Sequence, residues 1–296
     1  VKGGIRAHLG GKGDPICLMA HVDTLGAVVD YIKPNGRLML SKVGGLQANN
    51  VETETVRVKT RFSGEYEGTI QLANASAHVN GNLATTQRDF DTSMEVVLDE
   101  DVRSKADTEA LGILPGDFVC VEPRFTVTKK GYIKSRFLDD KASAAVLLAL
   151  AKYIRDENMT CKRSIWIAFT VYEEIGHGGA SGFPEGLTEM MSVDMGCVGE
   201  GLTCTERQAS ICAKDGGGPY NYDCVSNLIQ AAKKAGADYA VDVYHYYSSD
   251  VDVSLRAGYD VRHSLIGPGV YASHGYERTH IDGLTNTFDL LAAYLF

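Results

Sequence analysis

The stretch SIWIAFTVYEEIGHGG, residues 164–179, decides the fold because it joins an apolar segment to a polar turn. Residues 164–171 are apolar or β-branched almost throughout, which is typical of a strand buried on both faces of a sheet. Glu173 and Glu174 follow directly, and the glycine-rich segment 176–179 lets backbone approach a neighbour closely. Two adjacent Glu are often a solvated pair, but their place after a buried strand favours a functional site.

Outside about 46–130 the chain alternates strand-like and helix-like segments. The strand-like runs are Ile16–Ala20, Ser164–Val171, Met190–Val193, Ala240–Tyr244 and Arg262–Ile266. The helical patterns are Lys141–Ile154, Asp223–Ala235 and Thr285–Leu295. Such alternation predicts an α/β fold in which a mostly parallel sheet carries helices on both faces.

The middle of the chain has a different texture, with short β-rich runs separated by turn residues. The runs are Val56–Phe62, Thr69–Leu72, Met94–Leu98, Phe118–Val121 and Phe125–Thr128. Short strands with Gly and Pro punctuation predict a small β-barrel or sandwich. We therefore expect a catalytic domain formed by 1–45 and 133–296, with a β-rich domain inserted at 46–132.

Composition narrows the classes of partner. The 296 residues are 44% hydrophobic and carry a formal charge of −9, with no apolar run long enough to span a bilayer. Nucleic acid is an improbable partner because a phosphate backbone is bound through clustered Lys and Arg. The 7 Cys include no CxxC pair, which favours reduced thiols in a soluble, cytoplasmic protein.

The first candidate site residues are His21 and Asp23, where the run Ile16–Ala20 ends. Side chains two apart on an extended segment share a face, so His21 could bind a metal while Asp23 orients its imidazole. A single HxD is weak on its own, because a His at a strand end is often only a polar residue at a rim.

Asp139 and Asp140 stand at the start of the Ala-rich helix. One of them could cap the helix, which leaves the other free to reach a cation. Asp194 follows another apolar strand, where an Asp can also just begin a turn. In the Glu pair, one carboxylate could bind a metal while its neighbour takes a proton from water.

Two histidines near the C-terminus, His274 and His280, are candidate imidazole ligands, and either could be the one. All of these candidates lie at the carboxyl end of an expected strand or in the loop that leads to the next helix, which is where open α/β sheets bind ligands. Their nitrogen and oxygen donors suit zinc, cobalt or manganese, and suffice for two ions if one carboxylate bridges.

The ordered set of HxD, DD before a helix, EE-I-G-x-G-G, V-D-x-G and a late His, interrupted by a β-rich insert, resembles the cocatalytic-metal aminopeptidases of the glutamyl and deblocking (TET) type. The resemblance covers nearly the whole chain. It implies a three-layer zinc-peptidase fold with a mixed sheet, an insert that serves oligomerisation and as a lid, and a homo-oligomer, either a dimer or a tetrahedral dodecamer.

The same resemblance implies roles for single residues. One ion would be held by His21, Asp139 and Asp194, and the other by Asp139, Glu174 and the late His, with Asp139 bridging. Glu173 would be the general base, and Asp23 would orient His21. The late His lies in Ser-His-Gly-Tyr-Glu-Arg-Thr-His in place of the usual His-Ser-Pro, and its distance from the last helix favours His274 over His280.

The function expected is therefore removal of N-terminal residues from peptides by a water molecule activated by two metal ions. A metal-dependent amidase or deacylase with the same fold is the nearest alternative, because the two differ only in the shape of the pocket. A glycoside hydrolase also uses paired carboxylates but needs no metal. A binding protein that kept the fold would have lost a ligand or the base, and this sequence has all of them.

Overall fold

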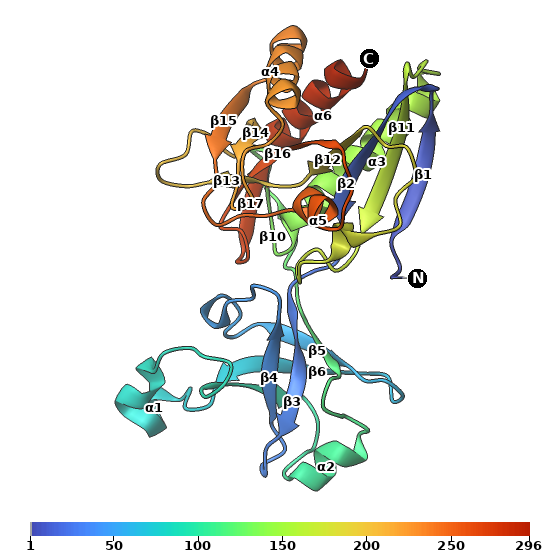
Figure 1. The fold of residues 1–296 in the computed structure, drawn as a ribbon. Coiled ribbons are helices and arrows are strands. Elements are labelled where there is room, and N and C mark those ends of the chain that lie inside the picture. The colour runs from blue at the N-terminus through green and yellow to red at the C-terminus, as the bar shows by residue number, and fades with distance from the viewer. Residues whose placement is uncertain (1) are drawn as a thin grey trace. The chain divides into compact units, whose positions relative to one another are not determined.

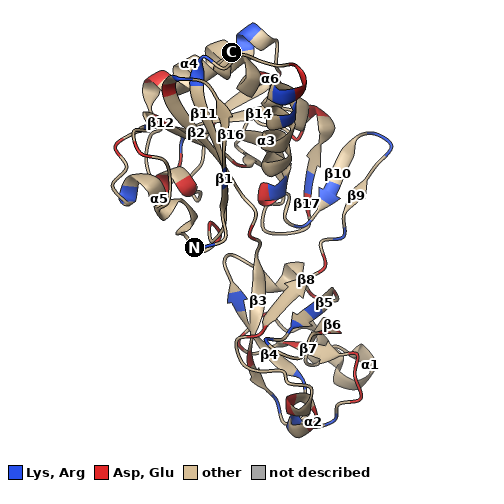
Figure 2. Ribbon diagram, turned by 90° about the vertical axis from the view of Figure 1, so that its right-hand side faces the viewer, with Lys and Arg blue, Asp and Glu red and all other residues tan. Residues whose placement is uncertain are grey.

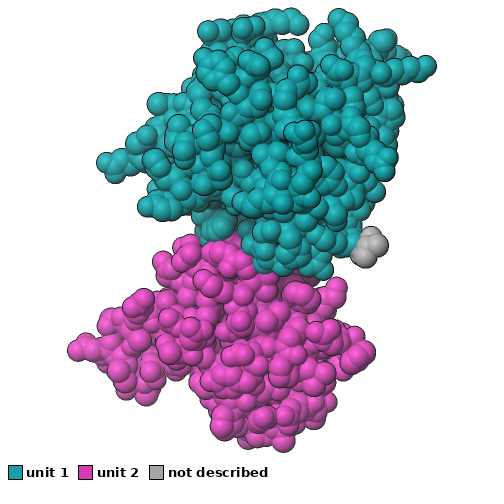
Figure 3. All heavy atoms as spheres, in the orientation of Figure 1, with its two compact units in different colours: residues 1–24, 125–296 teal, residues 25–124 magenta. Residues whose placement is uncertain are grey.

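The computed structural model describes residues 2–296, which form two compact units (Figure 3). Unit 1 comprises the residues up to Thr24 together with Phe125–Phe296, and unit 2 comprises Leu25–Arg124. Unit 2 is thus an insertion in unit 1. Its boundaries differ from the expected 46–132 by about twenty residues at its start and eight at its end.

Strand pairing explains this difference. The strands β3 (Gly26–Ile32) and β4 (Leu38–Val43) pair with the strands of unit 2, whereas β9 (Thr126–Val127) pairs with β10 (Tyr132–Ser135) in unit 1. The alternating pattern of 26–43 does not reveal which sheet a strand will join, because that depends on partners far away in the sequence.

Unit 2 is a closed barrel in the order β3-β4-β7-β6-β5-β8, as the short β-rich runs predict. Its other strands are β5 (Thr55–Lys59), β6 (Glu65–Leu72), β7 (Met94–Leu98) and β8 (Phe118–Val121), with short helices α1 (Ala77–Asn80) and α2 (Lys105–Ala110). In β5, Val56 and Val58 are buried while Thr55, Arg57 and Lys59 are exposed. Because the side chains alternate in this way, every second one points into the barrel, and these side chains form its apolar core.

Unit 1 is built on an 11-stranded mixed sheet (Figure 1). Four parallel strands form its centre, in the order β11 (Arg163–Thr170), β2 (Gly13–His21), β12 (Glu189–Val193) and β16 (Arg262–Tyr271). The antiparallel β1 (Ile5–Gly10) borders β11, and β17 (Glu277–His280), β10 and β9 continue beyond β16. The strands β13 (Gly196–Val198), β14 (Ala209–Lys214) and β15 (Tyr239–Val243) branch from β16.

Helices cover both faces of this sheet, as expected. Residues alternate along β2, so that Ile16 and Leu18 pack with Leu147 and Leu150 of α3 (Leu138–Asp156), while Met19 packs on the opposite side. The helices α4 (Tyr222–Ala235) and α6 (Ile281–Leu295) join α3 on the first face, and α5 (Asp250–Arg256) lies on the second (Figure 1). Because the four central strands run in the same direction, their carboxyl ends lie at one edge of the sheet.

Charged residues of both signs are interspersed over each unit (Figure 2). None of the helices within residues 2–296 combines the length and apolar content that a membrane crossing requires.

Candidate metal centre

His21 ends β2 and is 2% exposed. Its Nε2 lies 3.0 Å from Oδ1 of Asp139, and its Nδ1 lies 3.5 Å from Oδ1 of Asp23 and 3.3 Å from the Asp23 carbonyl oxygen. Its backbone N–H donates to Oδ2 of Asp140 at 3.2 Å. The ring is thus fixed on both sides, with Nε2 directed at the carboxylate predicted to bridge.

Asp139 and Asp140 precede the regular part of α3, and neither has helical backbone angles. The peptide bond between them is cis. Neither caps the helix from the N-cap position, which Phe137 occupies. Asp139 points one oxygen toward His21 and the other toward His274, whose Nε2 lies 3.7 Å from Oδ2. Asp139 is therefore the residue that links the two imidazoles.

The Glu pair follows β11, and its two carboxylates diverge. Oε2 of Glu173 lies 3.7 Å from Nε2 of His21, whereas Oε2 of Glu174 lies 3.6 Å from Nε2 of His274. The Asp23 carboxylate accepts hydrogen bonds from both backbone N–H groups of the pair, at 3.3 and 3.2 Å. Asp23 thus positions the Glu pair in addition to His21. The sequence does not indicate its contact with the Glu pair.

Asp194 follows β12, is 5% exposed, and belongs with His21 and Asp139 to one group of potential ligand atoms. Its backbone N–H donates to the Ile266 carbonyl at 2.9 Å, in the parallel pairing of β12 with β16. A Cβ added to Gly267 would lie 1.3 Å from the Asp194 carbonyl oxygen. Only glycine allows this approach, so Gly267 contributes to the placement of Asp194.

The two late histidines have different surroundings. His280 is 3% exposed, its Nε2 lies 2.6 Å from the Lys130 carbonyl, and its Nδ1 accepts from the N–H of Asp282 as the N-cap of α6. His274 has a side chain 40% exposed and faces Asp139 and Glu174. Both ring nitrogens of His280 therefore contact backbone groups, and the geometry favours His274 as the candidate ligand.

The predicted residues fall into two groups that share Asp139. His21, Asp139 and Asp194 form one, and Asp139, Glu174 and His274 form the other; within each, the potential ligand atoms lie within 4.8 Å of one another. Oε1 of Glu174 is buried without a hydrogen-bond partner among residues 2–296. A buried carboxylate oxygen in this state is costly unless a cation satisfies it. The donors and this oxygen fit divalent metal ions.

The electrostatics of the cluster agree with that fit. Burial, followed by the negative charge of Asp139, raises the pKa of Glu174 to about 9 and that of Asp194 to about 7. Burial and the charge of Asp194 likewise raise the pKa of Glu173 well above its usual range. Carboxylates packed this closely repel one another and retain protons at neutral pH, and bound cations would relieve that repulsion.

One residue of the site has no counterpart among the predictions. Glu277, the first residue of β17, is 2% exposed, and its carboxylate contacts the backbone of Asp139 and of His274. The signal in the sequence is slight, a Glu three residues after the candidate histidine, and its importance depends on a contact with the chain 138 residues earlier.

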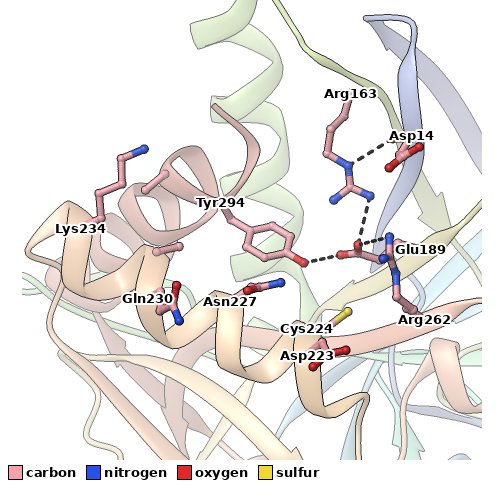
Figure 4. Close-up of a pocket in the computed structure, with 12 residues that line it drawn as sticks. Asp14, Arg163, Glu189, Asp223, Cys224, Asn227, Gln230, Lys234, Arg262 and Tyr294 are labelled. Carbon is pink, nitrogen blue, oxygen red and sulfur yellow. Dashed lines mark hydrogen bonds and ion pairs between the residues drawn. The ribbon is translucent and has the colours of Figure 1, made fainter.

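A surface pocket of about 580 Å³ lies away from this cluster, at the amino ends of the parallel strands. Arg163, Glu189 and Arg262 begin β11, β12 and β16 there (Figure 4). Oε2 of the buried Glu189 lies 3.1 Å from Arg163 and 3.5 Å from Arg262, while Oε1 accepts from the Tyr294 hydroxyl at 2.7 Å. Because both carboxylate oxygens of Glu189 are already engaged by these neighbours, we place the chemistry at the opposite edge.

Comparison with known proteins agrees with this geometry. A family model described as M42 glutamyl aminopeptidase matches residues 3–290. The chain is 43% identical over 296 residues to a Bacillus subtilis protein named "Putative aminopeptidase YhfE". The matched region covers 99% of this chain and 85% of that protein.

Two solved structures share the fold. The TET1 peptidase of Pyrococcus horikoshii, described as able to assemble into a tetrahedron or a large octahedral shell, is similar with a TM-score of 0.83 and 22% identity, over 99% of this chain and 87% of that chain. Aminopeptidase APDkam598 from Desulfurococcus kamchatkensis is similar with a TM-score of 0.87 and 22% identity, over 99% and 82%.

Proposed function

This chain belongs to the M42 glutamyl aminopeptidase family, and we propose that its activity depends on two divalent metal ions held at the carboxyl-end edge of the unit 1 sheet. The activity itself, metal-dependent removal of N-terminal residues from peptides, follows from the family. The number of ions, their ligands and the general base are the proposal.

One observation carries the proposal: Asp139 belongs to two groups of potential ligand atoms at once. His21, Asp139 and Asp194 would hold the first ion, and Asp139, Glu174 and His274 the second. Below, these are the first and second metal groups. Imidazole nitrogen with carboxylate oxygen is a donor set that suits zinc, with cobalt or manganese as alternatives.

The ions would polarise the scissile carbonyl and make a water molecule more acidic. Glu173 takes the proton from that water and later delivers it to the leaving amine. Its Oε2 lies 3.7 Å from Nε2 of His21, so the base faces the first metal group without belonging to either group. Asp23 keeps it there by accepting the Glu173 backbone N–H. The Glu173 side chain is 14% exposed, which limits competition from bulk water.

The decisive test is hydrolysis of a panel of aminoacyl-p-nitroanilides by metal-stripped protein, with and without added zinc, cobalt or manganese. N-acetylated versions of the same compounds are the matched controls. We expect metal-restored release from substrates with a free α-amine and none from the acetylated set.

Each other result would change the conclusion. Cleavage confined to the acetylated compounds, detected as acetate released from them, would identify a deacylase. Activity that resists chelation would remove the metal groups from the mechanism. Glu173→Gln protein that still turned over at the wild-type rate would show that the base is another residue.

We also propose that the protein works as a homo-oligomer on peptide substrates. The support is the fold shared with a TET1 peptidase that assembles into closed shells. Light scattering after size exclusion should give a mass several times the 32.0 kDa of one chain. A single-chain mass at micromolar concentration would contradict this part of the proposal.

A further inference from the structure

Glu277 lies between two candidate ligands without facing the ions itself. Its Oε2 accepts the backbone N–H of Asp139 at 3.0 Å, and its Oε1 accepts the backbone N–H of His274 at 3.0 Å. The residue is 2% exposed, so both bonds are shielded from water. One buried carboxylate therefore joins two segments that are more than a hundred residues apart in the sequence.

Both segments have irregular backbone at this point. His274 has a φ of 64° and Ala272 a φ of 59°, in the left-handed region that residues with a side chain rarely adopt. Phe137 has a φ of 65°, and Asp139 departs from helical angles although it lies at the start of α3. Segments in such conformations keep them only when surrounding contacts determine them.

Glu277 is itself fixed by regular structure. It begins β17, where it is paired with Ser135 of β10, and its neighbour Arg278 is paired with Tyr271 of β16. The carboxylate is thus presented from a strand held on both sides, and it reaches two loops that lack such support. A group placed this way can transfer the rigidity of the sheet to both loops.

We propose that Glu277 is a positioning residue that holds the backbone of Asp139 and His274 in the arrangement the second metal group needs. This inference rests on the proposed two-ion function. Asp139 and His274 supply two of the three side chains of that group. The first metal group depends less on Glu277, because His21 and Asp194 are held by Asp23, Asp140 and the pairing of β12 with β16.

Two variants test whether both carboxylate oxygens of Glu277 are needed. A Glu277→Gln side chain has the same size but presents one carbonyl and one amide group, so one of the two backbone N–H groups would meet a donor. A Glu277→Asp side chain keeps both acceptors but is one methylene shorter, and so cannot span both loops. The Asp variant also serves as the test if the Gln variant fails to fold.

The matched control is Glu189→Gln at the other edge of the same sheet. Glu189 is also 2% exposed and also has two engaged carboxylate oxygens, but it lies in the pocket of Figure 4, away from the metal groups. A general loss of stability from replacing a buried carboxyl group should appear in both variants. An effect on metal binding should appear only at Glu277.

The measurement is a calorimetric titration of metal-stripped full-length protein with zinc, supported by the visible spectrum of the cobalt form and by thermal unfolding without metal. We expect wild type and Glu189→Gln to bind two ions. Both Glu277 variants should bind the second ion about 10- to 100-fold more weakly, the range found when a group that orients a ligand is lost. The first ion should show a smaller loss of affinity, because Asp139 belongs to both groups while His21 and Asp194 keep their own supports.

Two results would overturn the inference, and they differ. If wild type binds two ions and the Glu277 variants bind both equally tightly, the positioning role is wrong and the two-ion function stands. If wild type binds fewer than two ions, the two-ion function fails and the inference falls with it.

Discussion

Glu173 and Glu174 are neighbours in the sequence, yet each carboxylate faces a different imidazole. Glu173 approaches His21 and Glu174 approaches His274. The two residues leave β11 at a point where Tyr172 has a φ of 71°, so the backbone turns sharply just before them. That turn lets adjacent side chains take the positions of the proposed base and of a candidate ligand within one site.

Replacing Glu173 by Gln should therefore separate catalysis from metal binding. We expect kcat to fall by a factor of about 10² to 10⁴, the usual contribution of a general base, because an amide cannot accept the proton. Metal content should stay at the wild-type level. Steady-state kinetics and elemental analysis check the two halves, with Glu185→Gln as an exposed control that should change neither.

The two late histidines give a second prediction. His274→Ala should lose the second ion with little change in the unfolding free energy of the metal-free protein. His280→Ala should do the reverse and cost roughly 0.5–2 kcal/mol, because it removes the N-cap of α6. Metal analysis and chemical denaturation of both variants test the pair, and loss of metal from His280→Ala would contradict the assignment.

The site was predictable to the extent that its residues follow apolar runs. His21, Glu173 and Asp194 each come within three residues of the end of a buried strand, so local pattern and topology together place them at one edge. Glu277 has no such signal. Its role comes from hydrogen bonds to the backbone of distant residues, and backbone N–H groups are the same in every sequence.

Among the structural elements, α5 and the loop after β14 each contribute one acid to a buried carboxyl pair, Asp252 and Asp215, that the sequence does not reveal. Burial, then hydrogen bonding to Asp215 and its charge, raises the pKa of Asp252 to about 7. Asp215, which follows β14, is fully buried and accepts hydrogen bonds from Gly217 and from the Tyr220 hydroxyl. The two acids therefore connect α5 to the loop after β14 most firmly when Asp252 holds its proton.

This pair predicts a pH dependence of stability. Below about pH 4, Asp252 is protonated in both the folded and the unfolded chain. Between pH 3.8 and about 7 the folded chain retains a proton that the unfolded chain has lost, so the pair's contribution to stability declines as pH rises. Asp252→Asn is neutral throughout. The unfolding free energy of this variant relative to that of wild type should rise by about 1–3 kcal/mol between pH 4 and pH 8, after allowance for solvent screening.

Urea denaturation across this pH range measures the effect. Asp223→Asn, which changes an exposed acid in the first turn of α4, is the matched control and should show no such rise. A flat difference for Asp252→Asn would mean that the carboxyl pair does not share a proton.

Element boundaries were less predictable than element types. Helices α3, α4 and α6 were expected from their apolar spacing, and the last of them begins four residues before the expected Thr285. Strand β16 continues through Gly267–Gly269, a segment whose Gly-Pro-Gly sequence is typical of a loop. Its pairing with β14 and β13 keeps it extended, which shows tertiary contacts overriding a local turn signal.

In the molecule as a whole, each of the two units has an apolar core of its own. All five candidate ligands lie in unit 1, whereas the barrel of unit 2 closes around its own apolar residues. A ligand stabilises the part of a protein whose folded form it binds. Added zinc should therefore stabilise unit 1 directly.

A paired substitution tests this division. Ile70→Ala in the barrel and Leu150→Ala in α3 both truncate fully buried side chains, and each should cost about 2–5 kcal/mol. Calorimetric scans with and without zinc should show that zinc offsets the loss in the Leu150 variant and not the loss in the Ile70 variant. Equal rescue of both would show that the units unfold as one.

Asp139 gives the site a further property, because its two oxygens serve different imidazoles. In the proposed two-ion site, an ion bound to one oxygen would fix the carboxylate that the other ion uses and would also place positive charge beside it, so the two binding events should be coupled. Such coupling must be reciprocal, whichever ion binds first. The metal content of the enzyme would then be set by the two sites acting together, and not by two independent affinities.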